Sequence, residues 1–463
     1  MTNNSMKKNI ESLVLSQKQF FLTQKTKETS YRKELLKLLY SEIKKNETAI
    51  CKALQEDFKK HEFETLLYEI QLVLSDLRLL ISKLEKWSKP KRKTAALVNY
   101  PSRDYIIPEP YGTVLIISPW NYPFQLAMSP LIAAVAAGNT VVLKPSELTP
   151  NTSSIIQRII NSVFKPTHVI VIEGDAEVAQ ELLSQVWDYI FFTGSPQVGK
   201  LVYKAAASNL TPVTLELGGK NPCIVDQTAE LKVAAKRIVW GKFVNAGQTC
   251  IAPDYLLVDN TIATSFIELL KHEITEAYGS NGTFSNDMPA IISQKHFERL
   301  TSYLKQGSII HGGKTLPEQL RIEPTLVFAD MEDAIMQGEI FGPILPIILY
   351  KKRDEIDSIL GRYGKPLAWY HFTSDFKWNK ELIGKFSFGG GVINDVMIHF
   401  GNKRLPFGGV GNSGIGAYHG KLSFDTFTHY KPIVRRATWI DIPLKYAPYV
   451  GKTKWIPWIE KLL

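Results

Sequence analysis

Residues 112–146, GTVLIISPWNYPFQLAMSPLIAAVAAGNTVVLKPS, decide the fold. The stretch opens and closes with apolar runs at 112–118 and 139–146, and a helical segment rich in small residues separates them. Continuous apolar runs of this kind are typical of strands that are buried on both faces, as in parallel sheets. Two such strands joined by a helix form a strand–helix–strand unit, so the stretch predicts a parallel sheet.

The same alternation of strand and helix continues along the chain in two series. The first series has strands at 112–118, 139–146, 167–174 and 187–195; the second begins at 211–225 and has further strands at 255–259, 341–350 and 366–372. Residues 8–90 instead have apolar residues at helical spacing, and 99–112 form an extended segment punctuated by prolines. This pattern predicts an α/β protein with a doubly wound parallel sheet.

The length and composition describe a globular protein of more than one domain. The chain has 463 residues, of which 44% are hydrophobic and 22% charged. The formal net charge is +10, but the basic residues are dispersed apart from modest clusters such as KPKRK at 89–93. A solvated basic surface explains this charge better than a nucleic-acid site, for which the sequence has no motif.

Cysteine usage and hydropathy favour the cytoplasm. The three cysteines, Cys51, Cys223 and Cys250, are an odd number at wide spacing, so we expect a reducing compartment and no disulfide framework. The N-terminal segment lacks the continuous apolar core of a secretory signal, and no run reaches the roughly 18 apolar residues of a membrane span. The apolar tail WIPWIEKLL could dock on another surface but is too short to cross a bilayer.

Cys250 lies in an unusual place for a thiol that serves only packing. Its stretch, VNAGQTCIAPDY at 244–255, is a polar, glycine-containing break between a helical pattern and an apolar strand. A cysteine kept for packing more often lies inside an apolar run. A reactive cysteine needs a stabilised thiolate or a nearby base, and the backbone N–H groups of GQTC could face an anion. Cys250 is therefore a candidate nucleophile, with an inert structural thiol as the alternative.

Polar side chains that end apolar strands supply the other candidates, because active sites of open α/β sheets collect at strand ends. Glu216 ends the strand of TLELGGK and could act as a base, although it could also cap a helix or pair with a lysine. Asn121 follows the strand of LIISPWNYPF, and its amide could donate to an oxyanion. Lys144, with Glu147 three residues later, could hold a ribose hydroxyl or a phosphate, or could be an ordinary surface lysine.

Two glycine-containing segments were compared as phosphate sites. The segment GVGNSG at 409–414 matches the dinucleotide fingerprint G-x-G-x-x-G, but no buried strand precedes it and no βαβ unit surrounds it, so a tight loop is expected there. The segment FFTGSPQVGK at 191–200 is the better candidate, because a strong apolar strand leads into Gly-Ser at a helix start. No C-x-x-C and no histidine pair at i, i+4 occurs, so no metal site is expected.

The motifs together resemble those of the NAD(P)-dependent aldehyde dehydrogenase family over nearly the whole chain. They occur here in the family's order: PWNYP, LKPSE, FTGSPQVG, LELGGKNP, NAGQTC, EIFGP and LPFGGVGNSG. The segments GQTCIAPDY and NDVMIHF, with the compact length, are similar to the class 3 branch. Members of that branch are often dimers, and some carry a C-terminal membrane anchor. This chain ends soon after YAPYVGKTKWIPWIEKLL, so no stable anchor is expected.

The resemblance implies a role for each matching residue. Cys250 would attack the aldehyde to form a thiohemiacetal, Asn121 and the Cys250 N–H would form the oxyanion hole, and Glu216 would activate the water that hydrolyses the thioester. The residues implied to contact the cofactor, NAD or alternatively NADP, are Lys144, Glu147, Gly194, Ser195, Gly199, Glu339, Phe341 and Trp120. Within this set Glu147 would disfavour the 2′-phosphate of NADP.

The resemblance also implies the fold and the partners. It predicts two doubly wound Rossmann-like domains with a small β bridging element: cofactor binding by residues 1–92 and 112–213, catalysis by 214–423, and dimerisation by 93–111 and 424–445. Medium- or long-chain aliphatic or aromatic aldehydes are the expected substrates, and a homodimer is the expected assembly. The alternatives are an acylating dehydrogenase that transfers the acyl group to coenzyme A, and a catalytically silent binding homologue.

Overall fold

The stretch at 112–146 forms the centre of a six-stranded sheet. Strand β3 (Thr113–Ile117) pairs in parallel with β4 (Thr140–Lys144), and helix α6 (Gln125–Ala137) connects them. Every residue of α6 is buried, which matches a helix that is apolar all round. The computed structural model describes residues 3–279, 284–305 and 307–460, and within this part of the chain the predicted strand–helix–strand unit is confirmed.

The six-stranded sheet has the order β17–β7–β6–β3–β4–β5 and is covered by helices on both faces. Its remaining strands are β5 (Val169–Val171), β6 (Tyr189–Thr193), β7 (Val213–Glu216) and the antiparallel edge strand β17 (Gly414–Ile415). Side chains of α1 (Asn3–Leu22), α8 (Ala176–Leu183) and α9 (Pro196–Ala207) pack on one face. Side chains of α6 and α7 (Pro150–Val163) pack on the other.

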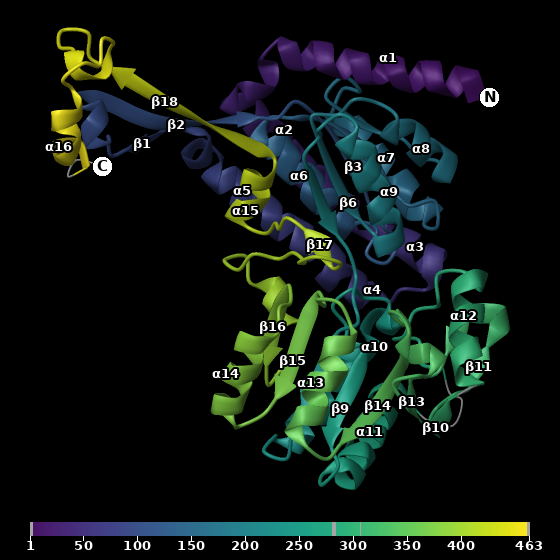
Figure 1. Ribbon diagram of the computed structural model, residues 1–463. Coiled ribbons are helices and arrows are strands. Elements are labelled where there is room, and N and C mark those ends of the chain that lie inside the picture. The colour runs from purple at the N-terminus through teal and green to yellow at the C-terminus, as the bar shows by residue number, and fades with distance from the viewer. Residues whose placement is uncertain (1–2, 280–283, 306, 461–463) are drawn as a thin grey trace.

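The N-terminal helices predicted over 8–90 form a further layer outside α6 and α7. They are α2 (Thr29–Lys45), α3 (Glu47–Phe58), α4 (Glu62–Thr65) and α5 (Gln71–Ser88), and a π-helical turn, Leu66–Ile70, joins the last two. Helix α5 packs along α6, and α3 packs along α7. Figure 1 shows α3 and α4 reaching the level at which the chain passes to the second sheet.

The second sheet has seven strands in the order β10–β13–β14–β9–β8–β15–β16, all parallel except the edge strand β10. Its strands are β8 (Pro222–Val225), β9 (Tyr255–Asp259), β10 (Ser308–His311), β13 (Thr325–Phe328), β14 (Ile344–Tyr350), β15 (Ala368–Phe372) and β16 (Gly390–Ile393). The associated helices are α10 (Leu231–Phe243), α11 (Ala263–Tyr278), α12 (Gln294–Leu304), α13 (Arg353–Arg362) and α14 (Phe376–Lys385). A two-stranded ribbon, β11 (Thr315–Leu316) with β12 (Arg321–Ile322), lies beside this unit.

The sequence pattern predicts that 211–225 begins the second series of strands. This prediction is wrong for Val213–Glu216, which belongs to the first sheet. Strand β7 pairs in parallel with β6 of the first sheet, and only β8 belongs to the second sheet. The segment GVGNSG is a loop, as expected, but it leads into β17, which pairs with β7. The chain therefore passes between the sheets just after Glu216, which lies at their junction.

A third, three-stranded sheet projects from the body of the molecule as an arm (Figure 1). Its central strand β2 (Ser102–Pro110) pairs with β1 (Lys91–Lys93) and antiparallel with β18 (Thr428–Arg436), which follows helix α15 (Lys421–Thr426). The C-terminal helix α16 (Ile456–Glu460) lies at the end of the arm that is farthest from the body of the molecule (Figure 1). The two segments expected to share a small sheet do pair, whereas their part in dimerisation stays a prediction.

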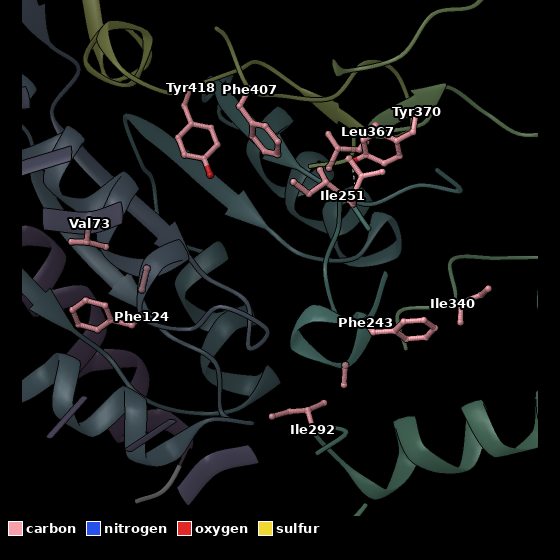
Figure 2. Close-up of a cluster of buried hydrophobic side chains, with 14 of the residues drawn as sticks. Val73, Phe124, Phe243, Ile251, Ile292, Ile340, Leu367, Tyr370, Phe407 and Tyr418 are labelled. Atoms are coloured by element: carbon pink, nitrogen blue, oxygen red, sulfur yellow. Dashed lines mark hydrogen bonds between the residues drawn. The ribbon is translucent and has the colours of Figure 1, made fainter. Parts of the chain in front are cut away.

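One continuous apolar core joins the two large units. Figure 2 shows members from both, with Val73 and Phe124 on one side and Phe243, Ile251 and Tyr370 on the other. All of these side chains are buried. Burial of this surface holds the two sheets at one relative position, which the site between them requires. Among the described residues no helix is both long and apolar enough to traverse a bilayer.

Asn139 provides a test of how the arm is attached to the body. Its buried amide accepts the Gly112 N–H and donates to the carbonyl oxygens of Ala134 and Phe427, each at 3.0 Å. Because Asn139→Ala leaves buried polar groups unpaired, we expect it to lower the free energy of unfolding by about 3 kcal/mol in a denaturant titration. Asn151→Ala, which removes an exposed amide, should cost about 0.5 kcal/mol. Equal losses would contradict this account.

Candidate active site

Most of the candidate residues line one cavity between the two sheets. The cavity has a volume of about 580 Å³ and lies beyond the carboxyl ends of strands β3, β6 and β7. The residues predicted from the sequence that line it are Cys250, Glu216, Asn121, Gly194, Ser195, Glu339, Phe341 and Trp120. Folding thus brings together residues that are far apart in the chain, at the end of the sheet where ligands of open α/β proteins bind.

The loop before Cys250 has an unusual backbone. Asn245, Ala246 and Gly247 all have positive φ angles, 53°, 54° and 71°. Residues other than glycine adopt this conformation at a cost, so surrounding contacts have to hold it. A side chain at Gly247 would place its Cβ 2.3 Å from the carbonyl oxygen of Gly342, so only glycine fits. The loop is therefore a specific, constrained turn and not a flexible connection.

Asn121, which follows β3 of the first sheet, and Asn245, within the loop itself, hold this loop in place. Asn245 Nδ2 donates to the Asn121 carbonyl oxygen at 2.9 Å and to the Gln248 carbonyl oxygen at 3.2 Å. Asn121 Nδ2 donates to the same Gln248 oxygen at 3.0 Å. Beside this bridge, the Tyr122 hydroxyl lies 2.8 Å from Thr249 Oγ1. The candidate oxyanion donor and the candidate nucleophile are thereby held in one rigid hydrogen-bonded bridge.

Cys250 is reached from two sides. Besides the cavity just described, it lines an apolar cavity of about 420 Å³. The side chains that form this second cavity include Leu67, Tyr68, Leu72, Tyr122, Trp240, Val244, Ile251, Met397, Ile398 and Phe400. A small apolar molecule could therefore approach the sulfur from one side while a polar ligand approaches from the other.

The environment of Cys250 keeps its thiol protonated. Burial, followed by the negative charges of Glu339 and Glu216, raises the pKa of Cys250 to about 12. Its own backbone N–H and that of Ile251 act in the opposite direction. Since the thiolate is the nucleophile, the thiol has to lose its proton to a nearby acceptor when it reacts.

Glu216 lines the same cavity as Cys250 and is a candidate proton acceptor. It ends strand β7, is buried, and has no hydrogen-bond partner for either carboxylate oxygen among the described residues. Burial raises the pKa of Glu216 well above its ordinary value. A buried carboxyl group without a partner is costly, and such groups are typical of general acids and bases.

Glu339 forms the opposite wall of the polar cavity. A Cβ at Gly218 would lie 2.1 Å from Glu339 Oε2, so the carboxyl group lies directly against this glycine. Burial and then the charge of Asp254 raise the pKa of Glu339 to about 8. Next to it, Phe341 has a positive φ of 52°, and its ring meets that of Trp120 edge-on at a centroid distance of 5.3 Å.

Three further residues at the site were not identified from the sequence. Lys220 Nζ pairs with Asp254 Oδ2 at 2.7 Å and donates to the Gly338 carbonyl oxygen at 2.8 Å. Arg299 donates to the Ile340 carbonyl oxygen at 2.7 Å. These bonds hold the loop that carries Glu339. Lys220 and Asp254 lie inside the quoted motifs and could have been noticed there, whereas no sequence signal identifies Arg299.

Three of the predicted cofactor residues do not line the cavity. Lys144 and Glu147 form an ion pair at 2.6 Å where strand β4 ends, beside the end of β3. At Gly199 an added Cβ would lie 2.6 Å from a methyl carbon of Leu217, so this glycine allows α9 to pack closely on the segment after β7. Ser195, which does line the cavity, caps α9 by accepting the Val198 N–H at 3.3 Å.

The cavity has the features that a polar ligand with hydroxyl and phosphate groups needs. Thr193 Oγ1 and Glu339 Oε1 are buried oxygens without a partner among the described residues, and both residues line the cavity. At Gly194 and Gly218 the wall is bare backbone next to these groups, and α9 begins at the cavity. Helix N-termini and glycine backbone are the usual surroundings of a bound pyrophosphate. The residues present therefore fit a dinucleotide.

The Aldehyde dehydrogenase family model matches residues 2–433, which is most of the chain. The chain belongs to the aldehyde dehydrogenase family. It is 48% identical to a 4,4'-diaponeurosporen-aldehyde dehydrogenase of Staphylococcus aureus over 96% of this chain and 98% of that protein. It is 41% identical to aldehyde dehydrogenase family 3 member F1 of Arabidopsis thaliana, over 96% of this chain and 94% of the relative. A substrate-bound AldH structure from S. aureus has a TM-score of 0.95 at 48% identity, over 97% and 99% of the two chains.

This aldehyde dehydrogenase is an NAD(P)-dependent oxidoreductase. An indole-3-acetaldehyde dehydrogenase from P. syringae, solved with NAD+, has a TM-score of 0.84 at 25% identity, over 93% of this chain and 89% of the other. A glyceraldehyde-3-phosphate dehydrogenase from Methanocaldococcus jannaschii, solved with NADP, has a TM-score of 0.83 at 25% identity, over 93% and 95%. Across the described part of this aldehyde dehydrogenase, no three His, Cys, Asp or Glu side chains gather as metal ligands would.

Glu339 makes a prediction about stability and pH. Because the pKa of Glu339 is raised from an ordinary 4.5 to about 8, the folded protein retains a proton that the unfolded chain releases. This contribution to stability is present below pH 4.5 and is lost as the pH rises toward 8. We expect Glu339→Gln to unfold at a higher temperature than wild type at pH 8.5, and to show a smaller advantage at pH 5. An advantage that does not grow with pH would contradict the assignment.

Proposed function

We propose that this aldehyde dehydrogenase oxidises apolar aldehydes to carboxylic acids through a covalent intermediate on Cys250, which water then hydrolyses. The single observation that carries the proposal is the position of Cys250 between a polar and an apolar cavity. The polar cavity suits the cofactor and the apolar cavity suits the substrate. The sulfur lies where both reach it, as the reaction requires.

In the first step the Cys250 sulfur bonds to the aldehyde carbon and the thiol proton passes to an ionised Glu216, which releases it to solvent before the second half of the reaction. The carbonyl oxygen becomes an oxyanion, which Asn121 Nδ2 and the Cys250 N–H are placed to stabilise. In the absence of substrate Asn121 donates to Gln248 O, and that bond keeps the amide directed toward the cysteine loop. Donors fixed before the reaction stabilise the transition state most, since they need no rearrangement.

In the second half of the reaction Glu216 activates water. A bound nicotinamide would supply the hydride acceptor for the thiohemiacetal carbon, and Cys250 would then hold the acyl group as a thioester. Glu216 then removes a proton from water as the water oxygen bonds to the thioester carbon, and the sulfur leaves and is reprotonated. Its unpartnered oxygens and its raised pKa support this role.

The cofactor would be held by residues at the ends of the first sheet. Gly194 and Ser195, at the start of α9, would contact the pyrophosphate, and Glu339 would bind the nicotinamide ribose with Phe341 and Trp120 packed nearby. Lys144 and Glu147 would bind the adenosine ribose. Glu147 would repel a 2′-phosphate, which favours NAD over NADP. Gly199 supports this site by permitting the close packing of α9.

The positions of these residues also suggest a separate role for each of the two α/β units. We assign cofactor binding to the first sheet and its helices and the nucleophile to the second. The arm carries exposed apolar side chains, Trp439, Ile440, Tyr449, Val450, Trp455 and Trp458 among them, and this exposure supports the proposal that the arm contacts a second copy in a homodimer. Three free cysteines agree with a cytoplasmic enzyme.

The proposal is tested by NAD(P)H formation with a panel of short, long and aromatic aldehydes, including 4,4'-diaponeurosporen-aldehyde, the aldehyde named in the S. aureus relative. We expect kcat/KM to rise with apolar surface, to be higher with NAD than with NADP, and not to depend on coenzyme A. Turnover that requires coenzyme A would mean that Glu216 is not the working base. No turnover with any aldehyde would favour a silent homologue.

Asn121→Ala tests the oxyanion hole. Removing one such donor typically lowers kcat by about 100- to 1,000-fold, and we expect a loss of this size because Asn121 Nδ2 lines the polar cavity beside Cys250 and donates to the cysteine loop at Gln248 O. The affinity for NAD is the control and should change little, whereas the melting temperature should fall without loss of the fold, because the Gln248 carbonyl oxygen keeps the Asn245 donor. Turnover close to that of wild type would sink the assignment.

A further inference from the structure

Two opposite charges lie buried beneath the active site, in the segment that links α3 to α5. Lys60 Nζ and Glu69 Oε1 are 2.6 Å apart, and both side chains are fully buried. A buried ion pair is weak evidence for stability, because the loss of solvation offsets the attraction between the charges. The contacts of the two residues give a better account of why the pair is there.

Glu69 determines where helix α6 begins. Its second oxygen, Oε2, accepts the N–H groups of Phe124 at 2.9 Å and of Gln125 at 3.2 Å. The residue before α6 makes no side-chain cap of its own, so Glu69 supplies the cap from another part of the chain. An anion at a helix N-terminus is favourable. The capped N–H of Phe124 is only three residues after Asn121, so the cap anchors the end of that loop.

Lys60 contacts the same loop from the other side. Its Nζ lies 4.0 Å from the centre of the Tyr122 ring, within the range of a cation–π contact. The Tyr122 hydroxyl in turn lies 2.8 Å from Thr249 Oγ1, directly beside Cys250. The ion pair is therefore connected, through two short routes, to the loop of Asn121 and to the loop of Cys250.

The same segment also supports the cysteine loop directly. Glu64 Oε1 accepts the N–H of Asn245, one of the residues with a positive φ angle, at 3.4 Å. The Phe58 carbonyl oxygen accepts the Ala290 N–H at 2.8 Å, and the Ala290 carbonyl oxygen accepts Gln248 Nε2 at 3.1 Å. Residues 58–69 thus contact both sides of the bridge between Asn121 and the cysteine loop.

We propose that Lys60 and Glu69 are positioning residues that hold the Asn121 amide opposite Cys250. They touch neither substrate nor cofactor and act only through the loop between β3 and α6. The inference rests on the proposed function, in which Asn121 stabilises the oxyanion. Small displacements of a catalytic group can cost about 100-fold in rate, so loss of the pair should lower turnover even where the fold survives.

The experiment combines this pair with Asn121 in a double-mutant cycle. The variant Lys60→Met/Glu69→Gln removes both charges together and keeps similar volumes, which avoids leaving one buried charge unpaired. We expect it to lower kcat with NAD and a long-chain aldehyde about 10- to 100-fold, with an unchanged equilibrium affinity for NAD. Introduced into Asn121→Ala, the same two changes should lower kcat less than about twofold, because residues that act through one group are not additive.

The controls separate this role from a general loss of stability. Asp175→Asn removes a carboxylate cap from α8, outside the site, and should lower the melting temperature without changing kcat. If the double change does not fold, Lys60→Gln/Glu69→Gln replaces it, since it leaves no buried charge unpaired and the amide oxygen at position 69 can still accept the N–H groups of Phe124 and Gln125.

Each outcome of the cycle has one meaning. If the Lys60/Glu69 changes lower kcat as much in the Asn121→Ala background as in wild type, the positioning role is overturned. The same holds if they do not lower kcat in wild type. Either result would leave the proposed reaction intact. A normal kcat for Asn121→Ala alone would instead overturn the oxyanion assignment, and the positioning role with it.

Discussion

The active site depends on one hydrogen-bonded bridge between the two α/β units. The amides of Asn121 and Asn245 both donate to the Gln248 carbonyl oxygen, and Asn245 also donates to the backbone of Asn121. This bridge holds the cysteine loop in a left-handed conformation that its asparagine and alanine would not adopt by themselves. Without it, Cys250 could not lie at the boundary of both cavities. The strained loop conformation therefore accompanies the position of Cys250 between the two cavities.

Three ionisable groups with raised pKa values lie close to this bridge. The thiol of Cys250 and the carboxyl groups of Glu216 and Glu339 share a buried space, and burial raises the pKa of all three. Burial therefore disfavours the charged form of each of these groups. In the proposed reaction an ionised Glu216 accepts a proton from sulfur or water and so takes the neutral form that burial favours. On the other side of the sulfur, the second cavity is lined mainly by apolar side chains.

Sequence patterns predicted most of the sheet strands and most of the site, for different reasons. Long apolar runs identified β3, β4, β6, β9 and β14 because strands buried on both faces are apolar throughout. Short strands such as β16 and β17 have no such signal, because they consist of only a few residues and are rich in glycine. Most residues that line the cavity lie in motifs. Arg299 lies in an ordinary helix and the Lys60–Glu69 pair in the segment between α3 and α5, where no motif identifies them.

What the sequence determined by itself was the α/β class, the family and the identity of the candidate groups, since these follow from local pattern and from residue type. Only the tertiary structure decided that β7 belongs to the first sheet. Glu216, the last residue of β7, therefore lies at the junction of the two units. The tertiary structure also decided which cavities meet at Cys250 and which buried charges hold its loop. The physical reason is that strand partners and buried ion pairs join residues distant in the chain. Their energies depend on desolvation and packing, which no local pattern records.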